Sequence, residues 1–178
     1  MMSSRTLYTF AFMAVFFLAN SCGLKSVGYS LSGASVGDAK TFQVNFFQNF
    51  ADQNPGSTIE PGLDRDFTLA LQDRIRDQTS LDLTNNNADL VYEGEIVEYR
   101  VAPMTATSNQ NAAQNRLTMS VNVRFFNNRK EDSDFEQRFS FFYDFSANDL
   151  LESVKSEAHT EIFERLTNDI FQASLADW

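Results

Sequence analysis

One stretch, residues 116–145, constrains the fold most, because two strictly alternating segments flank a polar turn. Side chains that alternate between apolar and polar are typical of a strand with one buried and one solvated face. In the first segment the apolar set is Leu117, Met119, Val121, Val123 and Phe125, and the polar set is Thr118, Ser120, Asn122 and Arg124. In the second segment the two sets are Phe135, Phe139, Phe141, Tyr143 and Phe145, against Glu136, Arg138, Ser140 and Asp144. Residues 127–134 between them are turn formers, so the pattern predicts a β-hairpin.

Two helical patterns can cover the apolar face of this hairpin. The first has an apolar residue at every fourth position and charged residues between, and consists of Leu63, Phe67, Leu71 and Ile75. The second is longer and consists of Leu151, Val154, Ala158, Ile162, Leu166 and Ile170, widened by Phe163 and Phe171. Ser146 and Asp149 have the spacing of a capping box, which predicts that the last helix begins after Ser146.

Two further strands are predicted before the hairpin. Phe42, Val44 and Phe46 alternate with polar residues, which predicts a first strand. Leu90 and Tyr92 point one way, whereas Val97, Tyr99 and Val101 point the other. The change of phase predicts a single strand bent near Gly94, because a glycine inside a strand often marks a bulge. Pro103 is expected to end this strand.

These elements predict one α+β domain over residues 41–178, in the order strand, helix, three strands, helix. The first crossover should be right-handed and make the first two strands parallel. The last three strands should form an antiparallel meander. The expected architecture is a two-layer sandwich, in which a mixed four-stranded sheet carries both helices on one face.

The N-terminus has the three parts of a secretory signal peptide over residues 1–21. Arg5 precedes an apolar run at 7–19, which is shorter than the ~20 residues that a membrane span needs. The residues that end in Ser21 and Cys22 resemble the lipobox of bacterial lipoproteins, in the loose form used by Bacteroidetes-type bacteria. The resemblance implies that Cys22 carries acyl chains and that residues 22–40 are a tether. The alternative for Cys22 is an ordinary buried cysteine. No acidic cluster follows Cys22, and by the same resemblance this favours the periplasmic side of the outer membrane.

Charge and motifs argue against several classes of function. The net charge is −10, which disfavours nucleic acid as a partner. The single cysteine excludes an intrachain disulfide and a cysteine-based zinc site. His159 is the only histidine, and no hydrolase, metalloprotease or phosphate-loop motif accompanies it. Residues 131–134 are acidic, but a solvated turn explains them better than a cation site. We therefore expect no catalytic residue, metal or cofactor, and predict an interaction protein.

Several stretches are distinctive by their order and spacing between Cys22 and Trp178, and they are 29–33, 78–81, 93–99 before Pro103, 112–121, 135–145, 168–171 and Trp178. Together they resemble the Bacteroidetes branch of the lipopolysaccharide-assembly lipoprotein (LptE) family. The resemblance implies a small α/β sandwich that plugs the outer-membrane barrel protein LptD, helps it fold and helps deliver lipopolysaccharide to the cell surface.

The plug role gives a set of candidate contact residues. Barrel lumens are polar, so the expected barrel contacts are Thr118, Ser120, Asn122, Arg124 and the loop residue Asn109. The alternative is that this face simply meets water. The family binds lipopolysaccharide through basic residues, and the candidates for that contact here are Arg116, Arg129 and Lys130. The competing function is a periplasmic lipoprotein that chaperones or anchors another envelope complex, such as a secretin.

Overall fold

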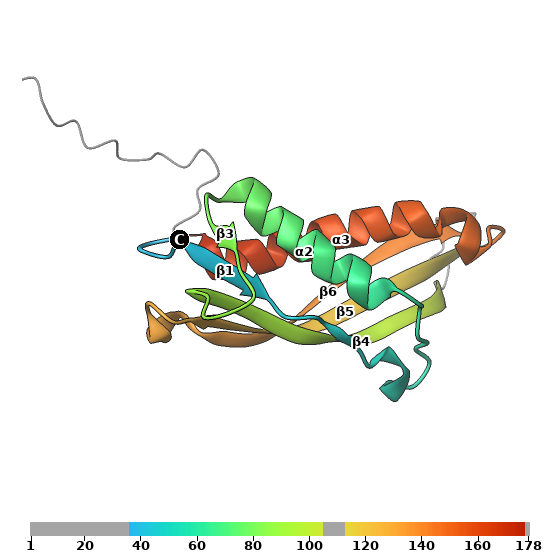
Figure 1. Cartoon of the computed structure of the whole chain (residues 1–178). Coiled ribbons are helices and arrows are strands. Elements are labelled where there is room, and N and C mark those ends of the chain that lie inside the picture. Colours follow the sequence, from blue (N-terminus) through green and yellow to red (C-terminus); the bar gives the residue numbers. More distant parts are fainter. Residues whose placement is uncertain (1–35, 105–112, 177–178) are drawn as a thin grey trace, which may run out of the picture.

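Two helices lie side by side on one face of a mixed β-sheet (Figure 1). This computed structural model describes residues 36–104 and 113–176, apart from the side chain of Glu131. Residues 1–21, Cys22 and most of the tether lie outside the described residues. The signal peptide, the lipidation site and the domain boundaries therefore stay predictions.

The sheet has six strands rather than the four expected. Its order is β3-β1-β4-β5-β6, and β2 also pairs with β4. In chain order the elements are β1 (Thr41–Val44), β2 (Gln48–Asn49), η1 (Ala51–Gln53), α2 (Leu63–Gln78), β3 (Asp82–Leu83), β4 (Leu90–Met104), β5 (Gln114–Asn127), η2 (Glu131–Ser133), β6 (Phe135–Ser146) and α3 (Leu151–Leu175). The two additional strands, β2 and β3, have two residues each, which is too short to produce a period in the sequence.

The predicted strand directions are confirmed. β1 and β4 are parallel, and β4, β5 and β6 form an antiparallel meander. All five apolar side chains of the first hairpin arm are fully buried. In the second arm Phe139 and Phe145 are buried, whereas Phe135, Phe141 and Tyr143 are only partly buried and pack on the core. The difference follows from position, because β6 is the outermost strand and its side chains have neighbours on one side only.

The assignment of Phe46 to the first strand was wrong. β1 ends at Val44, and the Phe46 side chain is 57% exposed. Phe47 is the core residue instead: its ring packs edge-on against Phe67 with centroids 5.2 Å apart. Its N–H donates a hydrogen bond to Thr68 Oγ1 at 3.1 Å. The contacts with α2 draw the backbone out of the strand and shift the buried position by one residue.

The bend predicted near Gly94 lies further along β4. Gly94 pairs in register with Val123, and the irregularity falls between Ile96 and Glu98. The glycine has a different role, because a Cβ atom built there would lie 2.8 Å from the Phe47 ring and 2.0 Å from the Asn122 carbonyl oxygen. Gly94 therefore makes room for close packing and does not mark the bulge.

Pro103 does not end β4, which runs to Met104. The Tyr99 carbonyl accepts a hydrogen bond from Thr58 N–H at 3.0 Å, so the backbone N–H and C=O groups of Tyr99 point away from β5. Alternate residues of a strand face the same edge. Pro103, four positions on, thus also faces away from β5, and its missing N–H removes no bond of the ladder.

Both helices bury the predicted stripes. Leu63, Phe67, Leu71 and Ile75 are buried on α2, which starts after Gly62 at a positive φ of 81°. On α3 the buried apolar set is Ala158, Ile162, Leu166, Ile170, Phe171 and Leu175, with Leu151, Val154 and Phe163 packed partly against the core.

The capping box at Ser146 was a wrong prediction. Ser146 is the last residue of β6, and its Oγ accepts a hydrogen bond from Asn148 N–H at 3.2 Å. The N–H of Asp149 donates to the Ser146 carbonyl at 3.0 Å. The pattern therefore stabilises a turn between β6 and α3. The helix itself begins at Leu151, after Leu150, which makes no side-chain cap.

Candidate partner interface

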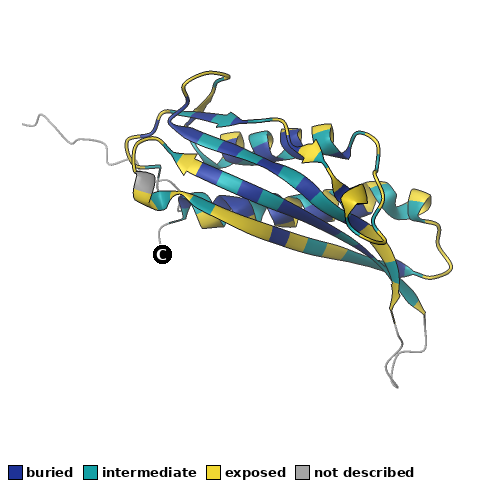
Figure 2. Cartoon of the chain, turned by 90° about the horizontal axis from the view of Figure 1, so that it is seen from below, coloured by how far each residue is buried: buried dark blue, intermediate teal, exposed yellow. Residues whose placement is uncertain are grey.

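Figure 2 shows the face of the sheet opposite the helices. This face is largely polar and carries most of the candidate contact residues. It is formed by β4, β5 and β6. Four arginines and four carboxylates on it pair with one another, and they are Arg100, Arg116, Arg124 and Arg138 with Glu93, Glu95, Glu98 and Asp144. We call this surface the polar sheet face.

Glu98 lies at the centre of the polar sheet face. Its carboxylate accepts a hydrogen bond from Ser120 Oγ at 2.9 Å and forms ion pairs with Arg138 at 2.7 Å and Arg100 at 3.1 Å. Burial opposes the charge, but the Ser120 hydroxyl and the two guanidinium groups outweigh it and hold the pKa of Glu98 below its usual range. Glu98 is therefore a fixed negative charge between two strands.

A second cluster connects β4 and β5 around Arg124. Its Nε lies 3.0 Å from Glu93 Oε1, and its Nη1 lies 3.2 Å from Glu95 Oε2. Asn122 donates to the other oxygen of Glu95 at 3.3 Å. The hydrogen bond to Glu93 is the main reason that the pKa of Arg124 is raised.

At the far end of β5, Arg116 makes a two-pronged pair with Asp144, with both N–O distances 2.7 Å. The guanidinium carbon also lies 3.5 Å from the centroid of the Phe142 ring. Two parallel hydrogen bonds and a cation–π contact fix this side chain firmly. The Arg116 side chain is only 29% exposed, so it is poorly suited to capture an anion without first leaving Asp144.

The predicted barrel contacts have three different outcomes. Thr118, Asn122 and Arg124 lie half-buried on the polar sheet face. Ser120 is on the same face but fully buried, because Glu98 and the Ser140 hydroxyl cover it. Ser120 therefore stabilises the polar sheet face through its hydrogen bonds and has no exposed surface for a partner to contact. Asn109 lies outside the described residues.

The three basic candidates are not brought together. Arg129 and Lys130 lie in the turn between β5 and β6, whereas Arg116 lies near the opposite end of β5. Arg129 Nε is 2.7 Å from Asp89 Oδ1. Both turn residues line a polar cavity of about 560 Å³ beside the end of α3.

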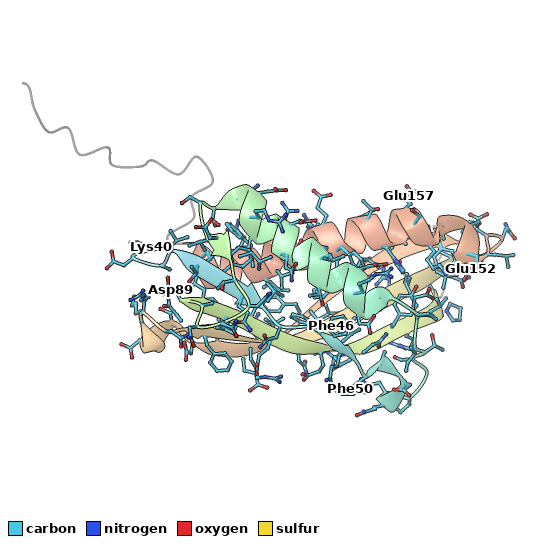
Figure 3. The ribbon with its side chains drawn as sticks, viewed as in Figure 1. Lys40, Phe46, Phe50, Asp89, Glu152 and Glu157 are labelled. Carbon is cyan, nitrogen blue, oxygen red and sulfur yellow. The ribbon has the colours of Figure 1, made fainter. Side chains whose placement is uncertain are left out.

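Asp89 anchors the start of β1 to the start of β4. Its Oδ2 accepts hydrogen bonds from the N–H of Lys40 at 2.8 Å and of Thr41 at 3.2 Å, and Figure 3 shows Asp89 and Lys40 at the same end of the sheet. The Lys40 amide is the largest influence on this carboxyl, and with Arg129 and Thr41 it lowers the pKa of Asp89 to about 2 despite burial. This cluster has a structural role, and Arg129 belongs to it through its ion pair with Asp89.

His159 is half-buried on α3. Its Nε2 is 2.9 Å from the Tyr99 hydroxyl, and its ring stacks on Phe163. Burial lowers its pKa, although the carboxylate of Glu60 opposes that shift. Nearby, Lys155 bridges Glu60 at 3.0 Å and Glu152 at 2.8 Å. These contacts fasten the segment before α2 to α3.

The acidic half of the polar sheet face was missed by the sequence reasoning. Glu93 and Glu95 alternate in β4, which is a signal for one solvated face. Their significance depends on the register, because Glu93 lies opposite Arg124 and Glu95 opposite Asn122. Without the register, the basic and acidic residues cannot be matched.

Two features are absent from the described part of the chain, a membrane-spanning helix and a metal-binding cluster. No helix between residues 36 and 176 is long and apolar enough to cross a membrane. No group of three or more histidine, cysteine or acidic side chains in this part is arranged to hold a metal ion.

Comparison with known families identifies the chain at the family level. The profile of the LptE family, described as lipopolysaccharide-assembly, matches residues 39–174. The chain belongs to the LptE family. The match covers the whole described domain except its first and last few residues. Among curated proteins, no sequence matches the chain significantly.

Several solved structures resemble this chain at low sequence identity. A hypothetical protein from Chlamydia trachomatis has a TM-score of 0.51 and 12% identity, over 76% of this chain and 98% of that chain. A minor lipoprotein from Acinetobacter baumannii has a TM-score of 0.44 and 12% identity, over 78% and 97%. The rare lipoprotein B from Shewanella oneidensis has a TM-score of 0.43 and 11% identity, over 74% and 89%. The Chlamydia structure therefore shares the α+β fold of this chain.

Proposed function

We propose that this LptE-family protein is an outer-membrane lipoprotein, anchored by acyl chains on Cys22, that plugs the LptD barrel and assists its assembly for lipopolysaccharide transport. We assign it to the Bacteroidetes branch of the family and to the periplasmic side of the membrane. Membership of the LptE family supports the pathway. The observation that supports the plug role is the polar sheet face, on which four arginines form ion pairs with four carboxylates.

A neutral, hydrogen-bonded surface suits the lumen of a barrel. Lumens are lined by polar side chains, so a plug needs polar groups on its surface but no exposed apolar patch. Ion pairs that are already satisfied within the plug, such as Arg116 with Asp144, need no partner of opposite charge. Burying them against a polar wall costs less than burying unpaired charges.

Crosslinking can test which face meets the barrel. A photo-crosslinking amino acid replaces Asn122 on the polar sheet face, and in a matched variant it replaces Asp73, an exposed residue of α2 on the helix side of the sheet. We expect Asn122 to crosslink to LptD in intact cells and Asp73 to do so far less. Equal crosslinking from both positions, or none from Asn122, would contradict the proposed orientation.

Co-purification tests the partner itself. The tagged protein, extracted from outer membranes, should bring down a large barrel protein in near-equal amount. Recovery of a secretin or another envelope complex in place of the barrel would favour the competing function. Recovery of the lipoprotein alone would contradict the plug role without affecting the assignment to the LptE family.

We propose no enzymatic role for this protein and leave lipopolysaccharide contact to a direct measurement. Because His159 bonds to Tyr99 and stacks on Phe163, we expect His159→Gln to preserve envelope function. Lys130→Gln should weaken binding of purified lipopolysaccharide more than Arg116→Gln does. The reason is that Arg116 is paired with Asp144, whereas no ion pair among the described side chains involves Lys130.

A further inference from the structure

The outer border of the sheet is formed by β6, which pairs only with β5 among the described strands (Figure 2). The pairing continues from Phe135 to Ser146 without a shift of register. Its 12 residues make β6 a long, regular edge strand. Such an edge presents unpaired backbone groups to any further strand.

One hydrogen bond fixes which residues of β6 face outward. Ala147 N–H donates to the Ala113 carbonyl at 3.0 Å, one step beyond the pair of Gln114 and Ser146. Since alternate residues of an antiparallel strand bond to the same neighbour, the odd-numbered residues of β6 face β5. The residues that direct N–H and C=O outward are Glu136, Arg138, Ser140, Phe142 and Asp144. Within the described residues, no backbone hydrogen bond reaches these five positions from the outer side.

The usual protections of an edge are missing from β6. Proteins block edge strands with proline, with bulges, with charges that point inward, or with a covering segment. β6 contains no proline and no bulge. Its helix-facing positions include Phe139, Phe141 and Tyr143 and no charged residue. α3 packs on the helix-facing side of the sheet and leaves the outer backbone of β6 unpaired.

The charges beside this border indicate what chemistry would fit. Glu157 on α3 makes a side-chain hydrogen bond with Tyr143, and Glu161 lies one helical turn further along; both acids are exposed. Burial raises the pKa of Tyr143, and these carboxylates raise it further. Arg165 of α3 also lies beside β6, and its guanidinium carbon is 5.2 Å from the Phe141 ring centroid. An added strand would place every second side chain on the helix side, beside Glu157 and Glu161. A second copy of this chain would bring the same two acids to that position, and like charges would oppose the pairing.

We propose that the outer edge of β6 binds an extended segment of another protein by strand addition, with lysine or arginine at alternate positions facing Glu157 and Glu161. Main-chain hydrogen bonds would supply affinity, and the alternate basic side chains would supply specificity. This border is separate from the polar sheet face, so the inference does not depend on the plug role.

A peptide binding experiment on the full-length protein in detergent tests this proposal. The probe is a fluorescein-labelled ten-residue peptide in which lysine and threonine alternate, and the comparison peptide has glutamate in place of lysine. We expect the lysine peptide to bind, and to protect the amides of the five outward-facing residues from hydrogen exchange. Ser140→Pro removes one outward N–H without touching the ladder to β5, so it should weaken binding ~10-fold, whereas Ser140→Ala, which keeps the N–H, should stay within ~2-fold.

The acids of α3 allow a matched charge test. Glu157→Gln and Glu161→Gln should each weaken binding of the lysine peptide ~2- to 5-fold and make it less sensitive to salt, as expected for an exposed ion pair. Glu164→Gln changes the net charge equally, but Glu164 lines the groove between α2 and α3, so it should have no effect.

Four results would overturn the proposal. They are equal binding of the lysine and glutamate peptides, binding by Ser140→Pro at the wild-type level, dimerisation through β6, and protection of the outward amides before any peptide is added. The third would identify a second copy as the occupant, and the fourth would identify a segment of the chain itself.

Discussion

Replacement of Gly94 by alanine tests the packing of β4. Strand propensity predicts that the substitution stabilises the protein, whereas the close contacts of Gly94 predict that it destabilises it. In an ordinary strand position, alanine is more favourable than glycine by roughly 0.5–1 kcal/mol, since glycine loses more conformational entropy on folding. At Gly94, however, the added Cβ would lie 2.0 Å from the Asn122 carbonyl oxygen and 2.8 Å from Cε1 of Phe47. Both distances are well below van der Waals contact, and the first is to backbone that no rotamer change can move.

The magnitude follows from how the clash can be relieved. Overpacking a core with one methyl group costs ~1–3 kcal/mol, and a displaced backbone puts Gly94→Ala at the upper end, ~3 kcal/mol. For a chain of this size that corresponds to a melting temperature lower by roughly 6–12 °C. Urea unfolding followed by circular dichroism measures the loss directly, provided that the slope of the transition is unchanged.

A second mutant protein, in which Phe47 is also changed, separates the energetic effects of the two contacts of Gly94. Phe47→Leu removes the ring contact but leaves the contact with the Asn122 carbonyl. We expect the alanine to remain destabilising in that background, by more than half of its cost in the wild type. A Gly94→Ala protein as stable as the wild type, or more stable, would refute the close approach and return Gly94 to the role of an ordinary strand residue.

Three further predictions follow from burial and charge. Phe47→Ala should cost ~3–5 kcal/mol of unfolding free energy, whereas Phe46→Ala should change it by no more than ~0.5 kcal/mol, since only the former ring fills the core; a larger loss for Phe46 in urea unfolding would contradict the observed shift of the buried position. Because folding lowers the pKa of Asp89 from 3.8 to about 2, its contribution is complete above pH 4 and is lost as the pH falls toward 2, so thermal melts of wild type and Asp89→Asn should differ most near neutral pH and converge near pH 2. Folding also lowers the pKa of His159 from 6.5, so the neutral imidazole supports the fold above that pH and acidification destabilises it; His159→Gln should remove this part of the dependence between pH 7.5 and 5, and an unchanged pH profile of the melting temperature would show that the histidine is not the group responsible.

Much of the architecture could be predicted from periodicity. The hairpin of β5 and β6 and the apolar stripes of α2 and α3 depend on patterns that repeat over many residues. Each repeat adds to the preference for one buried face, so long elements are determined locally. The part of the polar sheet face on β5 and β6 belongs to this class, because its residues occupy alternate positions of those strands, whereas the acidic part on β4 was missed. The parallel pairing of β1 with β4 follows from the usual right-handed connection through a helix.

What failed was local and short. The two-residue strands β2 and β3 have no period of their own and exist only because β4 and β1 offer them a partner. Ser146 has the spacing of a capping residue, yet it ends a strand because the ladder with Gln114 extends that far. In each case a non-local contact decided between alternatives that the local sequence left nearly equal.

The sequence by itself determined which residues must be buried together and which face of each long strand meets polar surroundings, because hydrophobic periodicity is a property of each segment alone. Only the tertiary structure decided which charges meet. Whether Glu98 meets Arg138, and whether Asp144 pairs with Arg116, depends on the register between different strands. That register is set by core packing, and the core is formed by all the elements at once.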